Sequence, residues 1–160
     1  MRRADREILN LVDILEILDR CEVIRLAVCA DDKPYIIPMN FAFETVGSGT
    51  FIYVHCASEG RKLEMVRHNP NVCFEADCSY ETLEAQYACN WGAQYESVIG
   101  EGIIAIIDSI LEKTHALDLL MKRYGFVGKP EYTPTEVHAV TILRIHISSI
   151  TGKQRIRPPG

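Results

Sequence analysis

The stretch Phe51-Ile-Tyr-Val-His-Cys-Ala-Ser-Glu-Gly-Arg-Lys-Leu63 carries two local signals in succession. Its first half alternates bulky and β-branched residues, which predicts a β-strand, and Gly60 ends that alternation. The residues from Arg61 onward predict a short helix that stops at Asn69-Pro70. The chain is therefore expected to run from a strand, through a turn of small residues, into a helix.

The predicted helix start after Gly60 is suited to an anion. The first N–H groups of a helix have no partner within the helix, and the helix dipole adds positive potential there. Ser58 adds a hydroxyl, Gly60 lets the backbone approach closely, and Arg61 and Lys62 each add a positive charge. We expect a phosphate group here; the alternative is that Arg61 and Lys62 are solvated residues of the first helical turn.

Composition restricts the class of protein. With 160 residues, 48% of them hydrophobic and 24% charged, the chain is expected to form one soluble domain, residues 1–152, followed by a basic, proline-containing tail, residues 153–160. A formal net charge of -5 argues against nucleic acid or an acidic membrane as the main partner. We see neither a signal peptide nor an apolar run of about 20 residues, so a cytoplasmic location is expected.

The six cysteines form no Cys-x-x-Cys pair. Most stand in predicted strands, where a reduced thiol acts as a small hydrophobic group. A zinc site that joins Cys56 or Cys73 with His55 lacks the usual ligand spacing, so no metal is predicted.

The remaining sequence predicts a mainly β domain with flanking helices. Two further helices are expected, Asp5 to Arg20 with Asp5 as N-cap and Ser109 to Tyr124 with a Ser-x-x-Glu capping box. Besides the strand of the opening stretch, five strands are expected, over residues 23–29, 35–44, 71–79, 95–107 and 139–150. Residues 80–91 and 128–135 are expected to be irregular. Six strands with short connections, kinked at Gly100 and Gly102, indicate a closed or partly split antiparallel barrel.

Pro38 stands in the middle of the second predicted strand. Because proline cannot donate a ladder hydrogen bond, it indicates an edge strand, a bulge or a break. A break would leave neighbouring backbone groups, and the amide of Asn40, available to a ligand. The alternative is a bulged edge strand with no ligand.

Four segments follow one another in the order Tyr35-Ile-Ile-Pro-Met-Asn-Phe41, Ile52-Tyr-Val-His-Cys-Ala-Ser-Glu-Gly-Arg-Lys62, Asn69-Pro-Asn-Val-Cys-Phe74 and Tyr95-Glu-Ser-Val-Ile-Gly-Glu-Gly102. Together they resemble the pyridoxamine 5'-phosphate oxidase-like FMN-binding proteins, and among them the nitroimidazole-resistance type. The resemblance covers nearly the whole chain. It implies a six-stranded split β-barrel that forms a homodimer, with FMN bound near the subunit interface.

The resemblance also implies which residues meet FMN. The edge of the isoalloxazine ring is expected to lie along Pro38, Met39, Asn40 and Phe41, and the part of FMN between ring and phosphate along His55, Cys56 and Ala57. The phosphate is expected to bind at Ser58, Gly60, Arg61 and Lys62. A further contact, from the same or the partner subunit, is expected at Ser97 and Val98. Trp91 and Tyr95 are weaker candidates for the substrate side. On the residues alone, His55 is equally well a half-buried strand residue, and Ser97 an ordinary sheet residue.

The implied activity is reduction of small nitroaromatic compounds, with His55 as our hypothesis for a residue that contacts substrate or supplies a proton. A pyridoxamine 5'-phosphate oxidase activity fits less well, because the only tryptophan is Trp91 and the chain ends in Lys153-Gln-Arg-Ile-Arg-Pro-Pro-Gly160. The alternative to an enzyme is a non-catalytic protein that carries flavin or haem. His55 and His146 are the candidate haem ligands of such a carrier.

Overall fold

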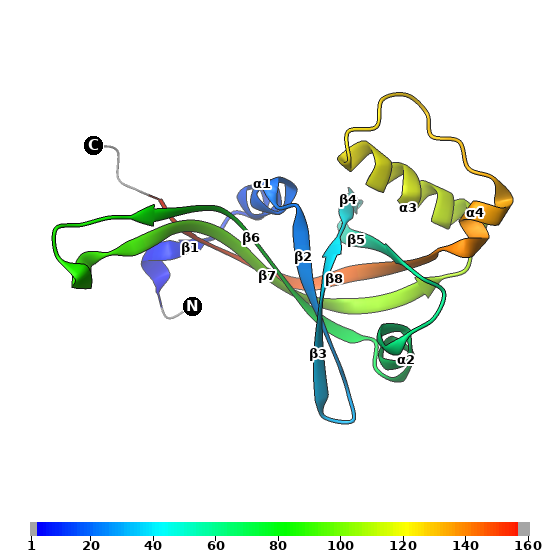
Figure 1. The fold of residues 1–160 in the computed structure, drawn as a ribbon, viewed down its shortest axis with the longest axis horizontal. Coiled ribbons are helices and arrows are strands. Elements are labelled where there is room, and N and C mark those ends of the chain that lie inside the picture. The colour runs from blue at the N-terminus through cyan, green and yellow to red at the C-terminus, as the bar shows by residue number, and fades with distance from the viewer. Residues whose placement is uncertain (1–2, 157–160) are drawn as a thin grey trace.

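The computed structural model describes residues 3–156 (Figure 1). Its helices are α1 (Leu11–Arg20), α2 (Arg61–His68), α3 (Ile110–Arg123) and α4 (Pro134–Ala139), with short 3-10 turns at Ala4–Arg6 and Ala88–Asn90. Its strands are β1 (Glu7–Ile8), β2 (Val23–Ala30), β3 (Lys33–Asn40), β4 (Ala42–Val46), β5 (Gly49–Cys56), β6 (Asn71–Leu83), β7 (Gly92–Ile107) and β8 (Thr141–Arg155).

All strands join one antiparallel sheet that curls without closing. Its order is β3-β2-β6-β7-β8-β5-β4, and β1 pairs with β8 at the side. The expected split barrel is confirmed. The sheet has eight strands rather than six because the second predicted strand divides at Phe41 into β3 and β4, and β1 adds a two-residue strand.

The division falls three residues after Pro38, which itself lies in β3 opposite Arg25 of β2. Because β3 ends the order of the sheet, it is an edge strand, where a missing N–H donor is tolerated. The chain changes partner at Phe41, since β4 pairs with β5 instead of β2. The Phe41 ring is fully buried at this point.

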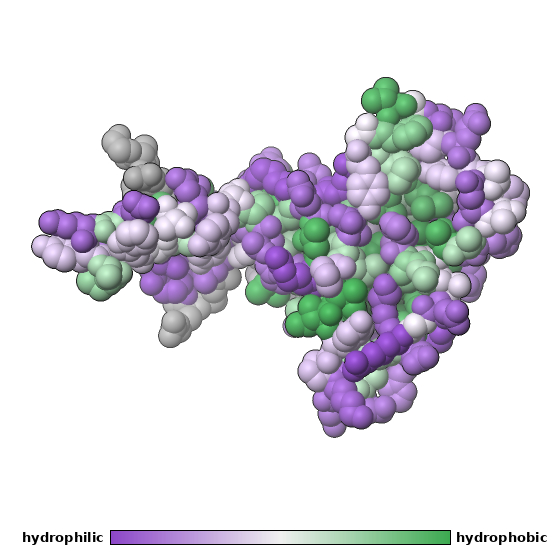
Figure 2. All heavy atoms as spheres, in the orientation of Figure 1, coloured by the Kyte–Doolittle hydropathy of each residue, from purple (hydrophilic) through white to green (hydrophobic). Residues whose placement is uncertain are grey.

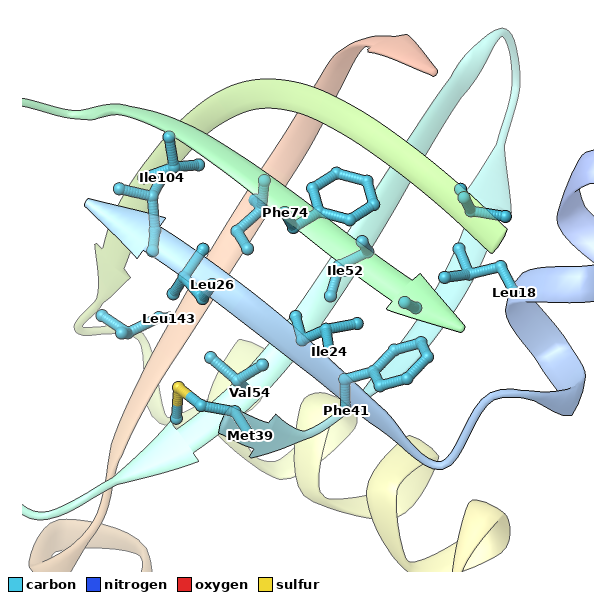
Figure 3. Close-up of a cluster of buried hydrophobic side chains, with 14 of the residues drawn as sticks. Leu18, Ile24, Leu26, Met39, Phe41, Ile52, Val54, Phe74, Ile104 and Leu143 are labelled. Atoms are coloured by element: carbon cyan, nitrogen blue, oxygen red, sulfur yellow. The ribbon is translucent and has the colours of Figure 1, made fainter. Parts of the chain in front are cut away.

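The core fills the space inside the curled sheet. Figure 3 shows Leu18 of α1 at one edge of a cluster of buried side chains that includes Ile24, Met39, Ile52 and Phe74. Phe41 and Val98, both expected at a cofactor, have no exposed surface and belong to this core. A Cβ on Gly100 would lie only 2.3 Å from the Phe74 ring, so this glycine makes room for the ring.

The first helix is shorter than predicted. It begins at Leu11, capped by the Asn10 side chain, which accepts from the Val12 N–H at 3.1 Å. Asp5 is not the N-cap; the Arg3 guanidinium donates two hydrogen bonds to its carboxylate, at 2.8 and 2.7 Å, and these lower the pKa of Asp5 to about 2. The prediction failed because Ile8 pairs with Gly152 of β8, a partner far away in the sequence.

Of residues 80–91, predicted to be irregular, only Tyr80 to Leu83 belong to a strand; residues 84–91 form the irregular end of a long hairpin, with a 3-10 turn at Ala88–Asn90. β6 continues to Leu83 and β7 begins at Gly92, so the hairpin projects as an arm to one side of the barrel (Figure 1). Its surface is largely hydrophilic, whereas hydrophobic patches gather on the body (Figure 2). The alternation of apolar and polar residues along β6 is interrupted by a register shift between Cys78 and Glu81, where Ser79 has φ +59°. The end of β6 therefore could not be recognised from the sequence pattern.

The C-terminal third combines confirmed and corrected predictions. Ser109 caps α3 as expected, accepting from the Glu112 N–H at 3.4 Å. The predicted loop 128–135 contains the start of α4, which has a capping box between Thr133 and Glu136. β8 runs on to Arg155, so the first part of the expected tail is strand and its end lies outside the described residues. Among residues 3–156, no helix is long and apolar enough to cross a bilayer.

Candidate functional site

The start of α2 is open, as the sequence predicted. Gly60 is the N-cap with φ +126° and ψ 165°, a conformation that only glycine adopts without strain, and no side chain caps the helix. The N–H groups of Leu63 and Glu64 bond to the Gly60 carbonyl at 2.9 and 3.3 Å. The preceding N–H groups, those of Arg61 and Lys62, stand at the helix start, where no intrahelical acceptor exists.

The two basic side chains at this helix start rest on β3. The Arg61 guanidinium lies 4.6 Å from the centre of the Tyr35 ring, and the Lys62 ammonium lies 3.9 Å from the Met39 sulfur. The structure therefore brings Met39 together with Arg61 and Lys62. Tyr35 was missed as a site residue, although its alternation with Met39 through Ile37 shows that these side chains share one face.

The residues between β5 and α2 form the connection to this site. Successive side chains of a strand point to opposite faces. Cys56 is half-buried and packs against the core, whereas His55 is exposed on the other face of β5. Ala57 and Ser58 follow in an exposed turn, so both can meet a bound molecule.

Asn40 lies apart from the α2 start, at the edge of a cavity. Its amide donates to the Glu22 carbonyl at 3.3 Å, and the cavity beside it has a volume of about 590 Å³. The Arg123 guanidinium lies 4.4 Å from the centre of the Phe41 ring at the same cavity. No sequence signal pointed to Arg123, because its partners lie more than a hundred residues earlier.

Ser97 lies at the opposite end of the sheet from α2. It is opposite Lys153 of β8, whereas His55 is opposite Ile142 of the same strand. Lys153 and Ile142 are eleven residues apart along β8, which is roughly 36 Å at about 3.3 Å per residue. In Figure 1, α2 and the arm lie at different ends of the sheet. Within one chain, Ser97 therefore does not meet the residues at the start of α2.

Trp91 and Tyr95 lie on the arm as well. The Trp91 indole N–H donates to the Ala85 carbonyl at 2.7 Å and stabilises the turn of the hairpin. Near Tyr95, the Lys153 ammonium lies 5.6 Å from the ring centre, and Arg6 donates to its hydroxyl at 3.5 Å. Burial opposes ionisation, but the hydrogen bonds from Lys153 and Arg6 outweigh it and lower the pKa of Tyr95.

Across residues 3–156 no group of three or more His, Cys, Asp or Glu side chains is arranged to hold a metal ion. A family model described as pyridoxamine 5'-phosphate oxidase matches residues 12–154, which includes every element from α1 to β8. The chain belongs to the pyridoxamine 5'-phosphate oxidase family.

Three similar proteins illustrate the range of this family's fold. An uncharacterized protein of Rhizobium meliloti is 33% identical over 107 residues, which cover 64% of this chain and 60% of that protein, less than two thirds of its length. A candidate 5-nitroimidazole antibiotic resistance protein from Bacteroides thetaiotaomicron is 27% identical with a TM-score of 0.80, covering 92% of this chain and 86% of that one. An FAD- and haem-binding protein from Mycobacterium smegmatis is 18% identical with a TM-score of 0.82, covering 97% and 76%.

The family's split barrel places the strand-turn-helix motif of the opening stretch at an exposed corner of the sheet. β5 leads into the start of α2 there, and β3 supplies the surface on which Arg61 and Lys62 rest. This corner is the candidate binding site.

Proposed function

We propose that this chain is an FMN-dependent oxidoreductase that holds the FMN phosphate at the start of α2 and reduces small nitroaromatic compounds. The observation that carries the proposal is the uncapped start of α2, where Arg61 and Lys62 combine free N–H groups with two positive charges. A flavin-binding family model and a 27% identical candidate nitroimidazole resistance protein support it.

The donors at the start of α2 fit a terminal phosphate better than they fit a neutral group. A phosphate accepts several hydrogen bonds and carries the charge that the helix dipole favours. Gly60 leaves the space beside it empty, since a Cβ there would meet no atom within 4 Å. Ser58 stands in the exposed turn before it and can add a hydroxyl donor.

When bound, a flavin supplies hydride or electron transfer at its ring, and the protein supplies orientation, polarity and access. In this chain Arg61 and Lys62 bind the phosphate end, which fixes the position of the rest of the molecule. Met39, only 8% exposed and part of the core, packs beneath Lys62 and supports it from β3. His55 is the candidate for substrate contact or proton supply, because its imidazole is exposed next to the turn.

We also propose that the working unit is a homodimer. The separation of Ser97 from α2 along β8 means that both can contact the same flavin only if they come from different chains. Ile99 and Ile103, which share the Ser97 face of β7, are 51% and 45% exposed and would be covered by a partner. A cytoplasmic location is proposed as well, which the six free cysteines favour.

The test begins with the absorption spectrum of the protein purified without added cofactor. Flavin bands at roughly 370 and 450 nm, retained after desalting, are expected, with released cofactor identified as FMN rather than FAD by chromatography. Addition of a chemical reductant and then a nitroimidazole should reoxidise the protein. His55→Ala should retain FMN and slow this reoxidation.

Each outcome has a distinct meaning. Protein that stays colourless and fails to retain added FMN contradicts the cofactor proposal. A haem spectrum, or flavin that is retained but never reoxidised by the nitro compound, supports a carrier instead of an enzyme. Unchanged reoxidation in His55→Ala removes that residue from the mechanism.

A further inference from the structure

A cavity of about 590 Å³ lies between the end of α1, the junction of β3 and β4, and the end of α3. Cavities of roughly 300 to 1,000 Å³ are typical of sites for small organic molecules. Asn40 lies at its edge and Arg123 forms part of its wall. Arg61 and Lys62, at the start of α2, are not part of its lining, so it is distinct from the proposed phosphate site.

Part of the lining of this cavity is apolar. Ala42 and Phe43 of β4 and Leu119 of α3 belong to this part. Phe43 also lines a neighbouring, smaller groove of about 400 Å³, where Val12 and Leu15 of α1 add further apolar side chains. Burial of an aromatic ring against apolar side chains is favourable, so this part of the cavity suits a small aromatic compound.

Three of the five charged side chains in the lining are already paired. The Arg20 guanidinium binds the Glu96 carboxylate at 2.7 Å, and the Arg123 guanidinium binds the Asp19 carboxylate at 3.0 Å. A charged ligand is therefore expected to meet the two lining groups that have no such partner.

Lys122 contributes an unpaired positive charge to the lining. Within residues 3–156 its ammonium has neither a hydrogen bond nor an ion pair, and the same holds for the Glu22 carboxylate. Arg20, Lys122 and Arg123 give the lining three positive groups against two negative ones, those of Asp19 and Glu22. The excess positive charge favours a ligand that offers acceptor oxygens, whereas Glu22 opposes such a ligand.

The cavity and the proposed flavin site meet the same strand, β3. Lys62 rests on Met39, and Asn40, at the edge of the cavity, is the next residue of that strand. A flavin that is held at the start of α2 and extends towards the end of β3 would bring its ring to the cavity.

We propose that this cavity binds small aromatic compounds, the substrate class of the proposed reaction, and that Lys122 selects those that carry a carboxylate. The ring packs against Ala42, Phe43 and Leu119, and the Lys122 ammonium donates to the carboxylate. This selection rests on the proposed function, which supplies the aromatic substrate class, but binding can be measured without turnover.

The test compares 4-nitrobenzoate with 4-nitrobenzamide, which has the same ring and nitro group but no charge. Calorimetric titration of the full chain, loaded with FMN, measures both affinities. We expect 4-nitrobenzoate to bind about tenfold more tightly, Lys122→Met to remove that preference and Glu22→Gln to increase it. Lys129→Met is the matched control and should retain the preference, because Lys129 is exposed in the loop after α3 and is not part of the cavity lining.

Amide chemical shifts of the wild-type protein locate the bound compound. Bound 4-nitrobenzoate should perturb the signals of Ala42, Phe43 and Leu119. Equal affinity for the two compounds, a preference that survives in Lys122→Met, or shift changes only elsewhere would overturn the proposal.

Addition of the same compound to the chemically reduced protein tests the proposed function separately. Binding at the cavity without reoxidation of the flavin supports the cavity site and contradicts only the nitroreductase activity. Reoxidation without shift changes at the cavity overturns only the cavity site.

Discussion

Gly60 is the residue on which the candidate site depends most. At φ +126° a side chain is strained, although no atom lies within 4 Å of where its Cβ would be. An added methyl group therefore acts through the backbone and shifts the N–H groups that follow. The neighbouring Arg61 and Lys62 keep their charges in such a variant, so the change isolates the geometry of the helix start.

We expect Gly60→Ala to destabilise the protein by about 1–3 kcal/mol and to weaken FMN binding by at least about tenfold. Chemical denaturation and an FMN titration measure the two effects. Gly47→Ala is the control, since Gly47 also has positive φ (+61°) and open space, in the turn between β4 and β5. It should lose stability and keep FMN affinity; equal loss of FMN in both variants would show that stability alone governs binding.

Helix α3 is attached to the rest of the molecule by Arg123 in its last turn. The guanidinium donates to the carbonyls of Leu18 (3.3 Å), Asp19 (3.0 Å) and Cys21, and pairs with the Asp19 carboxylate at 3.0 Å. It thereby adds a donor to carbonyl groups at the end of α1, where the last carbonyls of a helix lack i+4 partners; the Leu18 carbonyl also accepts from the Cys21 N–H at 3.3 Å. One side chain joins two helices and one wall of the larger cavity.

Arg123→Met should cost about 2–4 kcal/mol of unfolding free energy, because it removes a charged donor from the partly buried carbonyls of Leu18 and Cys21 and breaks the pair with Asp19. Urea unfolding measures this cost. Lys122→Met is the matched control on the adjacent, exposed position and should change stability by less than about 0.5 kcal/mol. Similar effects of the two substitutions would contradict the role given to Arg123.

α3 is also held to the sheet through Glu44 of β4. The Glu44 carboxylate accepts from the Tyr53 hydroxyl at 2.8 Å and is 2.9 Å from the His115 imidazole of α3. Burial disfavours the charged carboxylate, but the hydrogen bonds from His115 and Tyr53 outweigh it and lower the pKa of Glu44. A carboxylate with a lowered pKa in the folded state stabilises the fold at neutral pH. That stability is lost as the pH falls through the folded-state pKa, because the unfolded chain binds the proton first.

We therefore expect the unfolding free energy to fall between about pH 7 and about pH 3, and to fall less in Glu44→Gln. Urea titrations at both pH values measure the difference. Glu112→Gln is the control, since Glu112 pairs with Arg144 at 3.1 Å but is 51% exposed. If Glu44→Gln lost as much unfolding free energy between the two pH values as the wild type, the Glu44 carboxylate would not contribute to the acid dependence of stability.

The elements that the sequence predicted correctly are those whose signals lie within a few neighbouring residues of the chain. β2, β5 and α2 follow from alternation, from helical spacing and from Gly60, all within a few residues. The end of β6 was missed because the shift at Ser79 breaks the alternation, and the start of α1 because Ile8 pairs with Gly152.

The candidate site likewise has features that neighbouring residues predict and features that depend on contacts formed only in the folded chain. The anion-binding start of α2 was predictable because Ser58 to Lys62 are consecutive. The stacking of Arg61 on Tyr35 was not, because β3 and α2 meet only in the folded chain. Phe41 and Val98 belong to motifs of the family resemblance, and only burial shows that both are core residues.

At the scale of the whole molecule, we propose that the flavin site lies between two chains. The arm carries Ser97 away from α2, so the proposed dimer predicts that each flavin contacts α2 of one chain and the arm of the other. Two variants that each lack one half of the site should therefore recover FMN binding when they form a mixed dimer.

Lys62→Met and Ser97→Trp should each bind FMN poorly alone. Mixed and refolded together, they should regain binding, because one site of each heterodimer combines the intact α2 of one chain with the intact arm of the other. Fluorescence quenching of FMN measures the recovery. A mixture no better than its components would contradict a shared site, and sedimentation as a monomer would contradict the dimer itself.

The central claim is that the start of α2 binds the phosphate of FMN. Its most direct test is a titration of the protein with FMN and with riboflavin, which lacks the phosphate, repeated in Lys62→Met and in Arg67→Met from the other end of α2. We expect FMN to bind at least about tenfold more tightly than riboflavin, and only Lys62→Met to remove that preference. Equal affinity for the two flavins in the wild-type protein, or a preference that survives in Lys62→Met, would contradict the account.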